Sequence, residues 1–173
     1  MLKKWQSSNH MEAIATSKNN MTVVVDTEHS HAAIHLQDDP RLQAVVTRAL
    51  SQVNLEGETL AFEKDLGDVV GYMDLVKTTP EDEIVYAKRP NRDIYTRFVK
   101  NKEQTETSYV TCVLERVDDT TYELWSAWVG RLLPTFPGDK NETPESKSFW
   151  SEHALVWGTQ TVQPGTETDI CPW

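Results

Sequence analysis

Apolar and polar residues alternate with a period of two from residue 83 onward, a pattern typical of half-buried β-strands. The turn-like segments between the alternating runs are short, so consecutive strands are expected to pair antiparallel. The runs are 83–89, 94–100, 108–117 and 121–130. The sequence therefore predicts one four-stranded antiparallel β-meander over residues 82–130.

Helical periodicity is clearest over residues 39–53. Asp38 or Asp39 suits the N-cap, Pro40 suits the first helical position, and apolar residues then recur at helical spacing. The predicted fold class is α+β, a four-stranded antiparallel β-meander with this N-terminal helix packed on one face and with a C-terminal helix.

The C-terminal helix is expected over 144–155, with Thr143 as its N-cap. Five of the six tryptophans lie in the last 50 residues, so this part of the chain should be packed. We expect Trp125 and Trp150 to be largely buried and to join the C-terminal helix to the sheet.

A chain of 173 residues is most simply one domain with a real core. Residues 1–20 are polar and lack periodicity, and they are expected to form a flexible N-terminal tail or a loosely attached helix. The single α+β domain is predicted over 21–157. Residues 158–173, rich in Thr, Gln, Pro and Gly, are expected to form an irregular C-terminal tail.

Composition excludes several classes of protein. Two cysteines argue against a disulfide scaffold. There is no apolar run of about 18 residues and no signal-peptide pattern, so we expect a soluble, cytoplasmic protein without membrane contact. His29, His31 and His35 lack the supporting acid of a metal site, so no metal and no cofactor are predicted. A net charge of −10 disfavours broad electrostatic capture of nucleic acid.

A basic island interrupts this acidic chain at residues 86–102, where six cations face one acid, Asp93. The cations are Lys88, Arg89, Arg92, Arg97, Lys100 and Lys102. One interpretation is a site for phosphate or another anion. The other is that these side chains cover an open sheet and pair with nearby carboxylates such as Glu83, Glu115 and Glu123. Both interpretations stay open at the level of sequence.

Alternation predicts that one face of the meander is polar and aromatic, with cations at its centre. Arginine offers a planar fork to phosphate, tyrosine a stacking surface, and hydroxyl groups further hydrogen bonds. This face is predicted to present Tyr86, Lys88, Tyr95, Arg97, Thr111 and Ser126. With Arg89 beside them, the candidate residues for phosphate or anion binding are Lys88, Arg89, Tyr95, Arg97, Thr111 and Ser126. His153, with Glu152 beside it in the sequence, is a candidate general base near neutral pH.

A helix followed by an antiparallel meander with Arg, Lys, Ser/Thr and Tyr on one face resembles the small ribonucleases that include barnase, EndoU, the tRNase colicins and RelE-type toxins. The resemblance covers residues 39–130 and rests on element order and residue type. It implies that Lys88 and Arg97 bind phosphate, that Thr111 and Ser126 are polar sheet positions, and that His35 or His153 carries the proton. The acidity of the chain and its Trp-rich C-terminal extension depart from that group.

A second resemblance concerns the runs ELWSAWVGRLLPTFPG and HALVWG, which are similar to uncharacterised small bacterial or phage-associated proteins. This resemblance implies no activity.

Three functions therefore remain open. The first is a binding or partner protein, immunity- or adaptor-like, whose acidic surface docks on a basic protein. The second is a metal-independent enzyme that cleaves single-stranded RNA. The third is a small-molecule-binding domain walled by the C-terminal tryptophans. Whether the chain is an enzyme stays open here.

Overall fold

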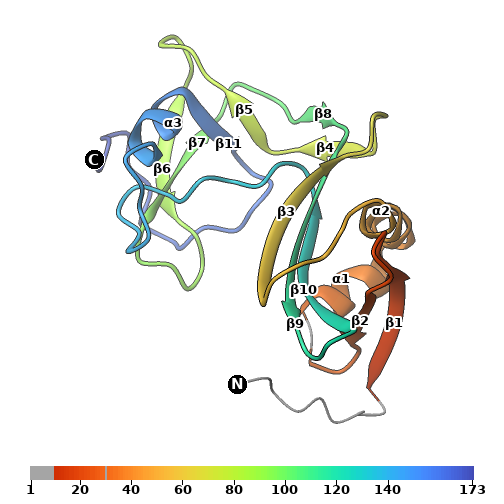
Figure 1. Ribbon diagram of the computed structural model, residues 1–173. Coiled ribbons are helices and arrows are strands. Elements are labelled where there is room, and N and C mark those ends of the chain that lie inside the picture. The colour runs from red at the N-terminus through yellow and green to blue at the C-terminus, as the bar shows by residue number, and fades with distance from the viewer. Residues whose placement is uncertain (1–9, 30) are drawn as a thin grey trace. The chain divides into compact units, whose positions relative to one another are not determined.

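The computed structural model describes residues 10–29 and 31–173, which form a mixed α+β structure that is mostly sheet, with few helices (Figure 1). The chain divides into two compact units. The first unit contains the described residues up to Gly71 together with Thr107–Leu132, and the second contains Tyr72–Glu106 and Leu133–Trp173. Each unit is assembled from segments that are distant in sequence.

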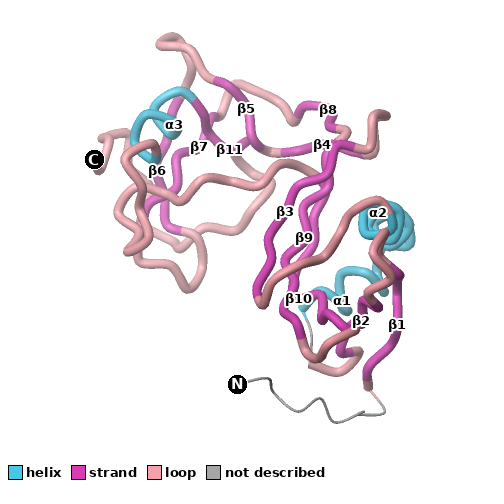
Figure 2. Tube along the Cα trace, viewed as in Figure 1, coloured by secondary structure: helices cyan, strands magenta, loops and turns pink. Residues whose placement is uncertain are grey.

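The first unit is built on a five-stranded sheet, whose strands are magenta in Figure 2. Its strand order is β1 (Met11–Thr16), β2 (Thr22–Asp26), β10 (Thr121–Val129), β9 (Tyr109–Arg116) and β3 (Thr59–Asp65). Neighbouring strands are antiparallel, except that β10 runs parallel to β2.

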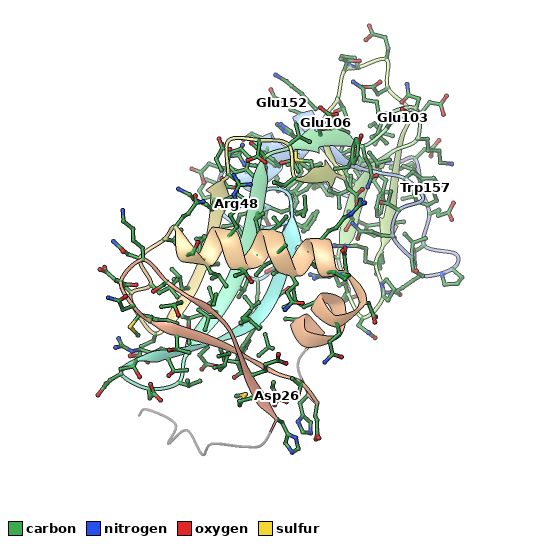
Figure 3. The ribbon with its side chains drawn as sticks, turned by 90° about the vertical axis from the view of Figure 1, so that its right-hand side faces the viewer. Asp26, Arg48, Glu103, Glu106, Glu152 and Trp157 are labelled. Carbon is green, nitrogen blue, oxygen red and sulfur yellow. The ribbon has the colours of Figure 1, made fainter. Side chains whose placement is uncertain are left out.

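Two helices, α1 (His31–Asp38) and α2 (Pro40–Ser51), pack on one face of this sheet, and Figure 3 shows α2 crossing its strands. The Asp39 side chain caps α2 by accepting hydrogen bonds from the backbone N–H groups of Arg41 and Leu42, and Pro40 is the first helical residue. Arg48 pairs with Asp68 beyond the other end of the helix. The predicted helix over 39–53 and its position on a sheet are confirmed.

The second unit is built on a four-stranded sheet and one helix, α3 (Ser146–Glu152). The sheet order is β5 (Leu75–Lys77), β11 (His153–Val156), β7 (Tyr95–Val99) and β6 (Ile84–Lys88), with β11 parallel to β7 and the other pairs antiparallel. Trp150 is fully buried, stacks on Phe136 at 4.3 Å between ring centroids, and donates its indole N–H to the Pro134 carbonyl. The expected burial of Trp150 is confirmed.

The remaining strands, β4 (Gly71–Met73) and β8 (Thr105–Thr107), form a two-stranded sheet at the sequence boundaries of the units. No helix among residues 10–29 and 31–173 is long and apolar enough to cross a membrane.

The prediction of a single four-stranded meander is wrong. The strands β6 and β7 form one antiparallel pair in the second unit, while β9 and β10 form another in the first. The strand next to each pair comes from outside residues 82–130: β11 pairs with β7, and β3 pairs with β9. Period-two alternation describes the two faces of each strand, but it does not specify the neighbouring strand, because backbone pairing groups are the same in every strand.

The predicted C-terminal helix over 144–155 is too long. It begins at Ser146 without a side-chain cap and ends at Glu152, and His153–Val156 is strand β11. The strand lies between β5 and β7, and its residues Ala154, Leu155 and Val156 are all buried. Burial on both faces of a central strand outweighs the helical pattern of the sequence.

The segments expected as tails contain ordered structure where they are described. Residues Met11–Thr16 form β1, whereas residues 1–9 lie outside the described residues. Near the other end, Thr168 exchanges two backbone hydrogen bonds with Tyr86, and the Gln163 N–H donates to the Lys88 carbonyl. The segment from 163 to 168 therefore docks along the free edge of β6.

Candidate functional site

The β6–β7 pair carries the centre of the basic island. Its register places Tyr86 opposite Arg97 and Lys88 opposite Tyr95. Side chains directly opposite in a sheet share a face, so these four candidates lie together on one face of the second unit's sheet, as alternation predicts.

Lys88 and Arg89 already have partners within this unit. Lys88 pairs with Asp93 at 3.2 Å and lies over the ring of Tyr95. The Arg89 guanidinium lies 4.9 Å from the ring centroid of Phe136, and its Nε donates to the Thr96 hydroxyl at 3.2 Å. Burial lowers the pKa of Arg89, which still remains charged at neutral pH. Both cations therefore have contacts within the second unit.

Arg97 has a different environment. Its residue is 8% exposed, and its Nη1 donates to the Thr78 hydroxyl at 2.8 Å and to the His153 carbonyl at 3.0 Å. None of the ion pairs among the described residues includes Arg97. Its Nε is buried without a hydrogen-bond partner. Arg97 is thus a buried cation with neutral neighbours.

The two candidate histidines fall in different units. His153 begins β11, where its ring stacks on Phe149 with centroids 4.1 Å apart and its Nδ1 lies 3.0 Å from the Phe149 carbonyl. It meets Arg97 through its backbone carbonyl rather than its imidazole. His35 belongs to α1 of the first unit. Each unit therefore contains one of the two proposed proton carriers.

Thr111 and Ser126 belong to the first unit and not to the sheet that carries Arg97. Thr111 is fully buried and donates its hydroxyl proton to the Gly130 carbonyl at 2.9 Å. Ser126 is partly buried and follows a register shift in β10. The six-residue polar face is divided between two sheets because β7 and β9 are not neighbours.

The outer face of the first unit's sheet, which we define as the face opposite α1 and α2, carries Thr111 and Ser126, but sequence reasoning gave no binding role to its carboxylates. In its register Glu123 lies opposite Glu115, and Glu115 lies opposite Thr59. Two residues further along the same strands, Val113 of β9 lies opposite Ala61 of β3; Val113 is partly buried and Ala61 is exposed. This face combines carboxylates with small and apolar side chains.

Trp125 is exposed, with 52% of its surface accessible, and it lies in β10 between Glu123 and Ser126, which both belong to the outer face. The expectation that Trp125 is largely buried is wrong. The register of β10 against β9 shifts between Leu124 and Ser126, so Trp125 is the inserted residue of a β-bulge. Alternation could not have identified its exposure, because an inserted residue has no register partner and interrupts the period of two.

Further carboxylates gather where β9 ends and β10 begins. Glu58 lies beside Arg116, whose N–H donates to the Glu58 carbonyl, and Asp118 and Asp119 form the turn between the strands. The Arg116 side chain donates to the carbonyls of both turn residues. Backbone N–H donation from Thr120 holds the pKa of Asp118 below its usual value, so this carboxylate stays charged.

Residues 10–29 and 31–173 contain no group of three or more His, Cys, Asp or Glu side chains placed to hold a metal ion. A cleft of about 120 Å³ in the first unit lies over Val25 and Leu36, with Glu12 and Thr27 among its lining residues. Pockets for drug-sized ligands are typically about 300–1,000 Å³, so this cleft suits only a much smaller group.

Comparisons with protein-family models, with curated proteins and with solved structures gave no match for this chain.

Proposed function

We propose that this chain is a partner-binding protein, immunity- or adaptor-like, whose outer face docks on a basic protein surface. The observation that carries the proposal is the exposure of Trp125 at a β-bulge. A tryptophan that is half accessible to water contributes little to the fold, whereas tryptophan is enriched among the residues that dominate binding energy at protein interfaces.

The charge of the surroundings indicates the chemistry of the partner. Glu123, two residues before Trp125 in β10, lies opposite Glu115 of β9, and the whole chain carries a net charge of −10. Complementary charge accelerates association and excludes partners of the same sign. A surface that presents Lys or Arg around an apolar residue is therefore the expected partner.

The ribonuclease interpretation remains a prediction with less support. Lys88 and Arg89, two of its proposed phosphate ligands, already contact Asp93 and Phe136. The His153 ring is engaged with Phe149. These contacts would have to break before Lys88, Arg89 or the His153 ring could act on RNA.

A defined probe tests the proposed docking face. The full chain is used to select binders from a random-peptide display library, and the selected peptides are synthesised and titrated. We expect sequences enriched in Lys and Arg next to an aromatic or aliphatic residue. Their affinity should fall at least about tenfold in Trp125→Ala, which is roughly 1.4 kcal/mol, and should weaken as salt is raised.

A matched control is Tyr72→Ala, since Tyr72 is also strongly exposed but lies in the second unit. This variant should bind the selected peptides as the wild type does. The proposal would be abandoned if no basic sequences were enriched, or if Trp125→Ala bound them with unchanged affinity. The other possible occupant of this face is a second copy of the chain, and sedimentation of the wild type tests for it. A dimer that Trp125→Ala dissociates would assign the face to self-association instead.

A further inference from the structure

The charge of Arg97 lacks a counter-charge in its own surroundings. The Thr78 hydroxyl and the His153 carbonyl, which accept its two hydrogen bonds, are both neutral. Of the buried side-chain nitrogen and oxygen atoms in the described residues, its Nε is the one without a partner. Buried arginines are normally paired, because an uncompensated charge inside a protein costs several kcal/mol.

Apolar residues surround this cation on its face of the sheet. Val99 follows it on β7, and Val76 and Ala154 occupy the same face on β5 and β11; all three are buried. A low local dielectric strengthens the attraction between a guanidinium and an anion that reaches it.

Tyr86 lies opposite this cation in the sheet and is itself buried. Its phenol, opposite Arg97 in the sheet, lies against both the Arg97 guanidinium and the Cys171 thiol. Burial raises the pKa of Tyr86, so at neutral pH its hydroxyl keeps its proton and can donate it in a hydrogen bond. Cys171 and its neighbour Ile170 are exposed, so the hydroxyl marks the boundary between buried and accessible groups.

We propose that the second unit binds a small oxyanion, of the phosphate or carboxylate type, at Arg97, with Tyr86 as a second donor. The guanidinium supplies the charge and a planar fork of N–H donors, and the phenol supplies an O–H donor to the same oxygen cluster. Lys88 and Arg89 take no part, because Asp93 and Phe136 already engage them. This site is independent of the outer face and of the proposed protein partner.

The test follows the Nε–H signal of each arginine by ¹⁵N NMR while inorganic phosphate is added at pH 7 and constant ionic strength. An Arg97→Lys variant identifies the Arg97 signal by its loss. We expect that signal to shift along a saturable curve, while the signal of the exposed Arg92 stays in place. A parallel titration with acetate distinguishes a phosphate-selective site from a general carboxylate site.

Thermal unfolding provides a second readout. Saturating phosphate should raise the melting temperature of the wild type and of Arg92→Met, compared with chloride at equal ionic strength, because a ligand that binds only the folded state stabilises it. The rise should be lost in Arg97→Met. In Tyr86→Phe, the phosphate concentration that gives half of the rise should be several-fold higher than in the wild type.

Two results would overturn the proposal. One is an Arg97 signal that does not shift with either anion up to about 50 mM, a concentration well above the dissociation constant expected for a site with bidentate donors. The other is a melting-temperature rise that does not saturate and is equal in wild type and Tyr86→Phe, since exclusion of phosphate from the surface stabilises proteins without any site. Both readouts remain decisive if Arg97→Met fails to fold.

Discussion

Arg131 and Glu63 form a bidentate ion pair in the first unit. The Arg131 Nε lies 2.9 Å from Glu63 Oε2, and its Nη2 lies 2.7 Å from Oε1. The Leu132 N–H also donates to Glu63 Oε2, at 2.8 Å, and the guanidinium lies 3.9 Å from the ring centroid of Tyr109. The pair ties the segment after β10 to strand β3, two strands away in the sheet.

Removal of this carboxylate should destabilise the protein in a pH-dependent way. The hydrogen bond from Arg131 lowers the pKa of Glu63, so its stabilisation is present above the unfolded-state value, about 4.3, and is lost as pH falls through the lower folded value. Since both side chains are partly exposed, we expect Glu63→Gln to cost about 1 kcal/mol at pH 7. Urea titrations at pH 7 and pH 3 measure the difference.

The control for that measurement is Glu12→Gln, because Glu12 is an exposed carboxylate of the same sheet. Its effect should be below about 0.5 kcal/mol at both pH values. An equal loss in the two variants, or a Glu63 effect that persists undiminished at pH 3, would contradict the assigned role of the ion pair.

Trp150 should be the most costly of the tryptophans to truncate. Its side chain is fully buried and contacts Phe136 and Phe149, so Trp150→Ala should lower the free energy of unfolding by about 3–5 kcal/mol. Trp125→Ala should cost less than about 1 kcal/mol, because Trp125 is half exposed. Chemical denaturation followed by circular dichroism compares the two, and a reversed order would show that the cores are wrongly assigned.

Asp39 should stabilise α2 as its N-cap. Its Oδ1 accepts hydrogen bonds from the N–H groups of Arg41 and Leu42 at 3.1 and 3.2 Å, and Asp39→Ala should cost about 1 kcal/mol. Asp38→Ala, one residue earlier at the end of α1, makes no contact with these donors and should be nearly neutral. If Asp38→Ala were the more destabilising variant, the sequence assignment of the cap would have to move.

The two cysteines should differ in reactivity. Cys112 is fully buried, and burial raises the pKa of its thiol to about 12, whereas Cys171 is exposed. Because the thiolate is the reactive form, titration of the folded protein with a chromogenic disulfide should modify one thiol quickly. Cys171→Ser should abolish the fast phase, and the second thiol should react only in urea. Two fast thiols per folded chain would refute the burial of Cys112.

Part of the candidate site could be predicted from local pattern. Alternation alone groups Tyr86 with Lys88 and Tyr95 with Arg97, and the β6–β7 register places all four on one face. The same rule fails within β10, where it groups Ser126 with Leu124, because the inserted bulge residue Trp125 places these two on opposite faces of the sheet. Nothing in the sequence signals that Arg97 lacks a carboxylate partner, since ion pairing depends on side chains brought close by the fold.

By itself, the sequence determined the features that depend on neighbours along the chain. The start of α2 at Pro40, after Asp38 or Asp39 as cap, follows from backbone donors that a nearby oxygen can satisfy. The two-sided character of β6, β7 and β9 follows from strand geometry. Only the tertiary structure decided which strands are neighbours. A strand's N–H and C=O groups pair equally well with any other strand, so the choice rests on burial summed over the whole core. As a result, β7 and β9 belong to different sheets, and His153–Val156 forms a strand although its sequence has a helical pattern.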